Sequence, residues 1–355
     1  MTLKQFLLKE NNNLDIIRIV CAALVIVEHC YDLSPKTIGM DPVKFLTGFS
    51  TSGLIAVKAF FFISGMLVTE SLMKKQSAKS FLISRVFRMM PALIFVILIT
   101  ALIIGPWVTT LTLPQYFKSK VLYSFIFKNC YFSNAYCLPG VFMDNHFWGV
   151  VNGSLWTLQY EARFYIILLC VFLVCKYTIK KYRLISLILT ILIFIDAFFD
   201  LQIIGKGASI KSLLPMSFAL GCFLAVNSSY FVINYKTVLV SAILMAIFWR
   251  TNKVNEILFN ITVCLAIIPI SQLNILKKIK IKYDISYGIY VWGFTVQQVL
   301  VYFKLYNNFY LFFIYSMVIT WVMGFISFVT VEKRCIDYGR KLDKRIGKIK
   351  TDTIK

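Results

Sequence analysis

The stretch VFRMMPALIFVILITALIIGPW, residues 86–107, decides the fold class. Arg88 is its only charged residue, and an α-helix of this length is about 33 Å long, enough to cross the hydrocarbon core of a membrane. The rest of the chain has the same character, since 59% of its 355 residues are hydrophobic and 15% are charged. A water-soluble domain carries about a quarter charged residues. The sequence therefore predicts a helical membrane protein.

Further apolar stretches follow one another along the chain with short connections. They predict an all-α, polytopic membrane helical bundle with about ten transmembrane helices. The first of them should remain as a span, because it contains ionisable residues and no cleavage pattern of small residues follows it. An additional apolar stretch at 121–132 is too short to cross and fits an interfacial or re-entrant segment. The expected spans are 14–31, 53–73, 86–107, 155–175, 184–200, 213–227, 237–249, 256–272, 285–303 and 309–331.

The basic residues set the expected topology. With the N-terminus inside, 25 Lys and Arg fall in cytoplasmic segments and 11 on the other side. The positive-inside rule then predicts both termini in the cytoplasm, so the net charge of +22 reflects topology and not nucleic-acid binding. A membrane domain would cover 1–331 with a periplasmic loop at about 108–154. Residues 332–355 would form a basic cytoplasmic tail suited to lying on anionic membrane lipid.

The nine cysteines have no metal-ligand spacing, so no metal is expected. Most of them lie inside apolar stretches. Cys130 and Cys137 flank a polar turn in the predicted outer loop, where an oxidising compartment would allow a disulfide. The sequence leaves that pairing open.

Ionisable residues in the first predicted span are candidates for function. Arg18 and His29 are eleven residues apart, so they share one helix face and lie about 16 Å apart along the axis. The alternative is that Arg18 pairs with Asp15 and that His29 caps the helix end. A second candidate is the Ser64–Gly65 pair within FFFISGML, which would let a ligand approach closely, although helix packing explains it equally well.

Two further motifs carry polar chemistry. Arg85 and Arg88 lie one turn apart, and paired arginines bind phosphates, although they would also serve as stop-transfer charges. In NGSLWTLQYE, residues 152–161, Trp156 and Tyr160 could stack on sugar rings while Glu161 orients a group or accepts a proton. The alternative for Glu161 is an internal ion pair with Arg163.

These motifs together resemble the acyltransferase-3 family of integral membrane acyltransferases, which acylate bacterial surface glycans such as lipopolysaccharide O-antigen, capsule and peptidoglycan. The resemblance covers nearly the whole chain. It rests on Asp15, on Arg18 with His29, on FFISG at 61–65, on Arg85 with Arg88, on LPGVF at 138–142, on NGSLWTL at 152–158 with Glu161, and on SYGIY at 286–290.

The resemblance implies an O-acetyltransferase of the bacterial inner membrane. Acetyl-CoA would be the donor from the cytoplasm, and the acceptor would be a hydroxyl of a lipid-linked or polymerised glycan in the periplasm. His29 would act as a general base or carry the acyl group, with Arg18 and Glu161 as its catalytic partners. The residues implied in substrate binding are Arg85, Arg88, Ser64 and Tyr287 for the donor, and Trp156, Tyr160 and Asn152 for the acceptor.

Trp292 stands where many relatives have a histidine, and His146 follows Asn145 where proline is expected. We therefore expect one catalytic histidine and interpret His146 as a loop residue. A proton-coupled transporter or a flippase for a lipid-linked sugar is the competing hypothesis, since intramembrane Arg, His and Glu also suit those proteins. The two halves of the chain show no convincing self-similarity, which disfavours it. The acceptor sugar and the oligomeric state are not legible in the sequence.

Overall fold

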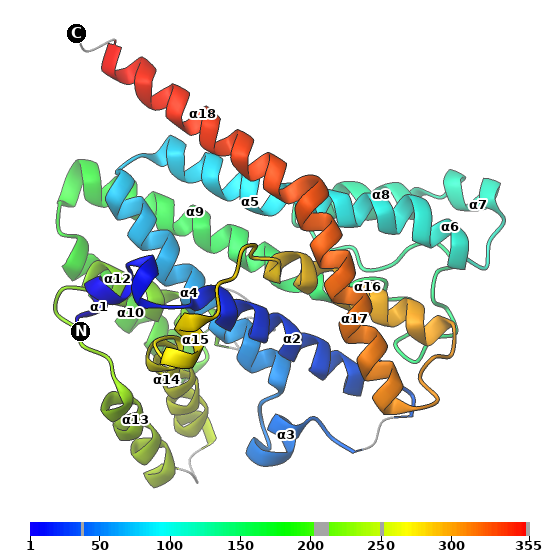
Figure 1. The fold of residues 1–355 in the computed structure, drawn as a ribbon, viewed down its shortest axis with the longest axis horizontal. Helices are drawn as coiled ribbons and strands as arrows, with labels where there is room; N and C mark the ends of the chain where they lie inside the picture. The colour runs from blue at the N-terminus through cyan, green and yellow to red at the C-terminus, as the bar shows by residue number, and fades with distance from the viewer. Residues whose placement is uncertain (37–38, 202–212, 249–251, 353–355) are drawn as a thin grey trace. The chain divides into compact units, whose positions relative to one another are not determined.

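A computed structural model of the chain describes residues 1–36, 39–201, 213–248 and 252–352 (Figure 1). These residues form helices and no β-strand. Two isolated bridges occur, between Thr109 and Val141 and between Cys137 and Val150. The prediction of an all-α protein is confirmed.

Each of the ten predicted spans forms a helix. They are α2 (Leu14–Leu33), α4 (Ser52–Lys75), α5 (Ala78–Ile99), α9 (Leu158–Val174), α10 (Tyr182–Phe199), α12 (Leu214–Val226), α13 (Tyr235–Ile247), α14 (Asn252–Ser271), α16 (Ser286–Tyr302) and α17 (Phe309–Ser327). Trp249, at the end of the seventh predicted span, lies outside the described residues. Within the described ranges, six helices are long and apolar enough to cross a membrane: 52–75, 78–108, 153–179, 182–199, 253–271 and 309–346. The count of about ten spans and the placement of the termini in the cytoplasm stay predictions.

Shorter elements connect or extend these helices. The short helices are α1 (Leu3–Phe6), α3 (Pro42–Thr47), α6 (Gly105–Val108), α7 (Leu113–Lys118), α8 (Lys120–Cys130) and α15 (Asn274–Lys278), and the final helix is α18 (Lys333–Asp352). Two 3₁₀ turns are η1 (Lys9–Asn11) and η3 (Gly153–Thr157). Three π-turns are η2 (Thr100–Ile104), η4 (Cys175–Ile179) and η5 (Phe328–Glu332).

The chain divides into two compact units, and α2 and α9 each contribute to both. The first unit contains Met1–Cys21, Pro42–Gln76 and Arg163–Asp284, and the second contains Ala22–Asp41, Ser77–Ala162 and Ile285–Lys355. The predicted domain boundary at 331 does not coincide with this division. It falls inside a helix that continues from α17 through η5 to Ile346.

In the first unit, α4 and α12 pack backbone against backbone. A Cβ added at Gly65 would lie 2.2 Å from the backbone oxygen of Phe218, and one added at Gly221 would lie 2.3 Å from that of Phe62. Small residues permit such close helix contacts within membranes. Gly65 therefore serves helix packing, which is one of the two explanations that the sequence left open for the Ser64–Gly65 pair.

In the second unit, α16 is the central helix, because every residue from Ser286 to Gln298 is buried. Gly288 brings it against α17, since an added Cβ would lie 2.8 Å from the backbone oxygen of Gly324. The basic helix α18 runs alongside the first part of α5 (Figure 1). Ser80 on α5 donates a hydrogen bond of 2.8 Å to Asp343 on α18.

The predicted outer loop contains α7 and α8. The apolar stretch at 121–132 forms most of the eleven-residue helix α8, which is too short to cross a membrane. Cys130 is half-buried, Cys137 is exposed, and both are free, so the disulfide that the sequence left open is not formed. Burial raises the pKa of the Cys130 thiol.

Candidate active site

His29 lies one turn before the end of α2 and is half-buried in the second unit. Its ring meets the edge of Phe294 on α16, with centroids 5.1 Å apart and planes at 81°. Phe294 in turn fits over Gly153, where an added Cβ would lie 2.6 Å from Cε2 of the ring. The ring of Phe294 therefore lies between His29 and a glycine of the segment that precedes α9.

Hydrogen bonds fasten the segment before α9 to α16. Gln298 donates to the backbone oxygens of Phe147 and Val150, at 2.8 and 2.5 Å. Asn152 donates to the backbone oxygen of Val291 at 2.8 Å, and Thr295 donates to that of Val151 at 3.2 Å. Because the three donor side chains are buried, each of these bonds gives a polar group in the interior its partner.

Tyr290 links the same helix to the 3₁₀ turn η3. Its hydroxyl donates to the backbone oxygen of Ser154 at 3.0 Å and lies 2.6 Å from the hydroxyl of Thr157. Glu28 on α2 and Glu161 on α9 both act electrostatically on Tyr290. Three predicted motifs, around His29, Glu161 and Tyr290, are thus gathered in one unit.

The aromatic pair predicted for sugar binding lies at the start of α9. Trp156 and Tyr160 meet edge to face, with ring centroids 6.0 Å apart. Trp156 is half-buried, whereas Tyr160 is buried. Asn152 is also buried, and its Oδ1 has no hydrogen-bond partner among the described residues.

The predicted donor-binding residues are divided between the two units. Arg85 and Arg88 are half-buried on α5 in the second unit. Tyr287 joins them there, because its hydroxyl donates to the backbone oxygen of Met89 at 3.0 Å. Ser64 belongs to the first unit, where its hydroxyl is 2.7 Å from that of Tyr165.

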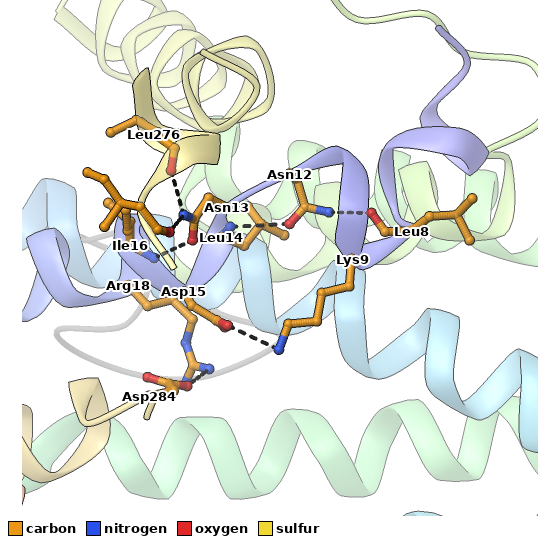
Figure 2. A network of polar contacts seen from close by, with 11 residues as sticks. Leu8, Lys9, Asn12, Asn13, Leu14, Asp15, Ile16, Arg18, Leu276 and Asp284 are labelled. Carbon is orange, nitrogen blue, oxygen red and sulfur yellow. Dashed lines mark hydrogen bonds and ion pairs between the residues drawn. The ribbon is translucent and has the colours of Figure 1, made fainter. Parts of the chain in front are cut away.

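Arg18 has a partner that the sequence analysis did not foresee. Figure 2 shows its guanidinium directed at Asp284, with which it forms an ion pair, while Asp15 pairs with Lys9 at 3.4 Å. The suggested pairing of Arg18 with Asp15 is therefore wrong. Asn13 adds to the link, since it donates to the backbone oxygens of Leu276 and Ile279 at 2.7 and 2.8 Å. The start of α2 is thus bound to residues 276–284.

Comparison with known proteins identifies the family. A family described as "Acyltransferase domain" matches residues 11–331. The chain belongs to the acyltransferase-3 family. An O-acetyl transferase of Shigella phage Sf6 is 29% identical over 343 residues, which cover 92% of this chain and 96% of the phage protein. Nodulation protein 10 of Rhizobium leguminosarum bv. viciae is 34% identical over 169 residues, covering 44% and 43% of the two chains. No solved structure matches.

Two residues beside His29 in this acyltransferase were missed by the sequence analysis, namely Phe294 and Gln297. Both lie in the apolar stretch of α16. The sequence feature that could have indicated polar contacts there is the consecutive pair Gln297–Gln298. Trp292, where the resemblance led us to expect a histidine, is fully buried and packs against Phe95 with ring centroids 6.2 Å apart. His146 is exposed in the loop, as predicted.

The candidate site has a defined set of polar groups in the second unit. Among the described residues, no group of three or more His, Cys, Asp and Glu is placed to hold a metal ion. The polar groups gathered in the second unit are an imidazole, two carboxylates, two arginines and several hydroxyls and amides. These are the groups that proton transfer and anion binding require.

Proposed function

We propose that this acyltransferase is a membrane O-acetyltransferase that moves an acetyl group from cytoplasmic acetyl-CoA to a hydroxyl of a surface glycan, on the periplasmic side of the bacterial inner membrane. The observation that carries the proposal is the setting of His29, a half-buried imidazole in the same unit as Arg85, Arg88 and Trp156. The similarity to the phage O-acetyl transferase supports acetyl as the group, because it extends over 96% of that protein.

In the direct reaction, neutral His29 removes the proton of the sugar hydroxyl while the hydroxyl oxygen attacks the thioester carbonyl. The C–S bond then breaks, and the imidazolium returns the proton to the CoA thiolate. In the two-step alternative, a ring nitrogen attacks the thioester, the C–S bond breaks, and the N–H proton of the ring goes to the CoA thiolate. The sugar hydroxyl then attacks the acetyl-imidazole, the N–C bond to the acetyl group breaks, and the ring takes up the hydroxyl proton. Both routes need one ring nitrogen of His29 with a free lone pair.

The remaining residues take supporting roles in the proposal. Arg85 and Arg88 bind phosphates of the donor, and Tyr287 holds their helix. Half-buried Trp156 presents aromatic surface to the acceptor sugar, with buried Tyr160 packed against it. Asn152, whose Oδ1 has no partner among the described residues, is the proposed hydrogen-bonding residue for the acceptor. Glu161, in the same unit, is the proposed catalytic partner of His29. Arg18 and Ser64 belong to the first unit, where Arg18 pairs with Asp284 and Ser64 contacts Tyr165, and their roles in catalysis and donor binding stay predictions.

The deciding experiment is mass spectrometry of surface polysaccharide from cells with and without the chain. We expect a gain of one acetyl group per repeat, which His29→Ala abolishes. His146→Ala is the matched control, because it removes the other of the two histidines, from an exposed loop, and should leave the gain intact. Acetylation by folded His29→Ala, or an unchanged mass in a host with a suitable glycan, would overturn the proposal.

A second experiment measures CoA release by the purified protein. Loss of a charge-assisted hydrogen bond costs about 1.5–3 kcal/mol, so Arg85→Ala should raise the KM for acetyl-CoA by at least about tenfold. Lys79→Ala, on the same helix and exposed, should leave the KM near its original value. Equal KM values for the two variants would remove the donor site from α5.

A further inference from the structure

Gln297 is a fully buried glutamine on α16 whose amide is fixed against α2. Its Nε2 donates to the backbone oxygen of Ile26 at 3.0 Å and to Sγ of Cys30 at 3.1 Å. Ile26 and Cys30 lie on either side of His29 in the helix. The amide is therefore held against the turn that carries the imidazole.

The other polar atom of this amide, Oε1, has a candidate hydrogen-bond partner in Nδ1 of His29. Among the described residues, Oε1 of Gln297 and Nδ1 of His29 are both buried and both lack a hydrogen-bond partner. The two side chains are near enough to act on one another as hydrogen-bonding groups. A buried polar atom without a partner costs about 1–3 kcal/mol, so a small movement that joins these two atoms is favourable. The amide oxygen can only accept, and Nδ1 therefore has to be the donor.

We propose that Gln297 is the positioning residue of His29, which it holds in the tautomer with hydrogen on Nδ1. This inference rests on the proposed function of His29. Since a neutral imidazole carries one N–H, a proton on Nδ1 leaves the lone pair on Nε2. His29 is half-buried although Nδ1 is not accessible, so its accessible surface belongs to its other atoms. During transfer Nε2 takes the hydroxyl proton and then gives it to the thiolate, while Nδ1–H stays with Gln297.

An amide suits this role better than a carboxylate would. A carboxylate beside a buried imidazole stabilises the imidazolium, which has no lone pair left to accept a proton. The amide orients the ring and adds no charge. The other titratable groups next to His29 on α2 are Glu28, Cys30 and Asp32. Tyr290 lies one turn before Phe294 on α16, and Glu28 and Glu161 act electrostatically on it.

The first test reads the tautomer directly. The full chain contains two histidines, so labelling with ¹⁵N-histidine gives signals from two imidazoles. The signals that disappear in His146→Ala belong to His146, and the others belong to His29. We expect His29 to carry hydrogen on Nδ1 and Gln297→Met to shift it toward the other tautomer. A His29 with hydrogen on Nε2 in the unaltered protein would overturn the inference. Because this measurement needs no turnover, it separates failure of the inference from failure of the proposed function.

The second test uses kinetics of the purified chain across pH. Gln297→Met should lower kcat by at least about tenfold with little change in KM, because the base is disordered and the substrates are not. Gln297→Glu should retain activity at alkaline pH. As the pH is lowered, this variant should lose activity at a higher pH than the unaltered enzyme does, since the carboxylate favours the imidazolium.

Gln298→Met is the matched control for kinetics. This neighbouring glutamine is equally buried but bonds to Asn145 and to the carbonyls of Phe147 and Val150. Its loss should lower the unfolding temperature and leave the pH profile in place. The inference would be refuted by wild-type kcat in Gln297→Met. It would equally be refuted if both Gln297 variants behaved as Gln298→Met does, with lower stability and an unmoved pH profile.

Discussion

Replacing Gly153 by alanine tests whether the ring of Phe294 sets the position of His29. The added Cβ would lie 2.6 Å from Cε2 of the ring and 3.0 Å from Cδ2 and Cζ. Ordinary contact begins at 3.4 Å, so the ring has to withdraw by the difference, about 0.8 Å. Gly153 has no positive φ, which means that the backbone itself tolerates alanine.

The ring has little free space into which it can withdraw. Phe294 is 4% exposed and packs against His29 on one side and Phe147 on another, at centroid distances of 5.1 and 5.8 Å. Overpacking of this kind costs about 1–3 kcal/mol of stability. Misplacing a catalytic group by about 1 Å can lower the rate by about 100-fold. We therefore expect kcat of Gly153→Ala to fall by about 10- to 100-fold while the protein still folds.

The assay is acetyl transfer to the purified glycan, with thermal unfolding measured beside it. In Phe294→Leu the nearest clashing atom, Cε2, and Cζ are absent, so Gly153→Ala combined with Phe294→Leu should be no slower than Phe294→Leu alone. Gly293→Ala is the control, because its Cβ meets Ile26 at an ordinary 3.4 Å. Activity of Gly153→Ala within about twofold of the unaltered enzyme, or additive losses in the double variant, would refute the reasoning.

Three other outcomes are expected. Gly65→Ala drives a Cβ to 2.2 Å from a backbone oxygen of α12, so thermal unfolding should show a loss of at least about 3 kcal/mol, and a stable variant would contradict the packing of α4 on α12. Arg18→Ala removes the ion pair between Arg18 and the mostly buried carboxylate of Asp284, so thermal unfolding should show a loss of about 2–3 kcal/mol, partly recovered in Arg18→Ala/Asp284→Ala. The raised pKa of Cys130 leaves less thiolate at neutral pH, so timed maleimide labelling followed by mass spectrometry should show exposed Cys137 modified first. The difference between the two labelling rates should narrow as the pH rises, and equal rates at neutral pH would contradict this.

Apolar stretches predicted the helices well, because a helix is how a chain satisfies its own backbone within lipid. The stretch 213–227 became Leu214–Val226, and 285–303 became Ser286–Tyr302. The helix α5 begins at Ala78, capped by Ser77, and so starts before the predicted span at residue 86. Hydropathy detects apolar residues, and the first part of this helix is polar. The division into two units depends on contacts between distant segments and leaves no mark on hydropathy.

The candidate site was predictable where charge appears in an apolar context. His29, Arg85 and Tyr287 were found in this way or by resemblance, and the structure places them in one unit. Gln297 was not found, because a neutral amide in an apolar stretch has the signature of ordinary helix packing. The partnership of Arg18 with Asp284 was also missed, since 266 positions separate the two residues.

The π-helix between α17 and α18 marks where this part of the chain can change in length. A π-helix holds one residue more than the α-helical turn it replaces, so deleting one residue from Phe328–Glu332 would convert it to α-helix. The register of α18 would be kept, and Gly339 and Asp343 would stay against Phe87 and Ser80 on α5. A deletion between Lys333 and Gly339 would instead rotate these two residues by about 100° away from α5. Homologous sequences should therefore gain or lose a single residue at Phe328–Glu332 more readily than between Lys333 and Gly339.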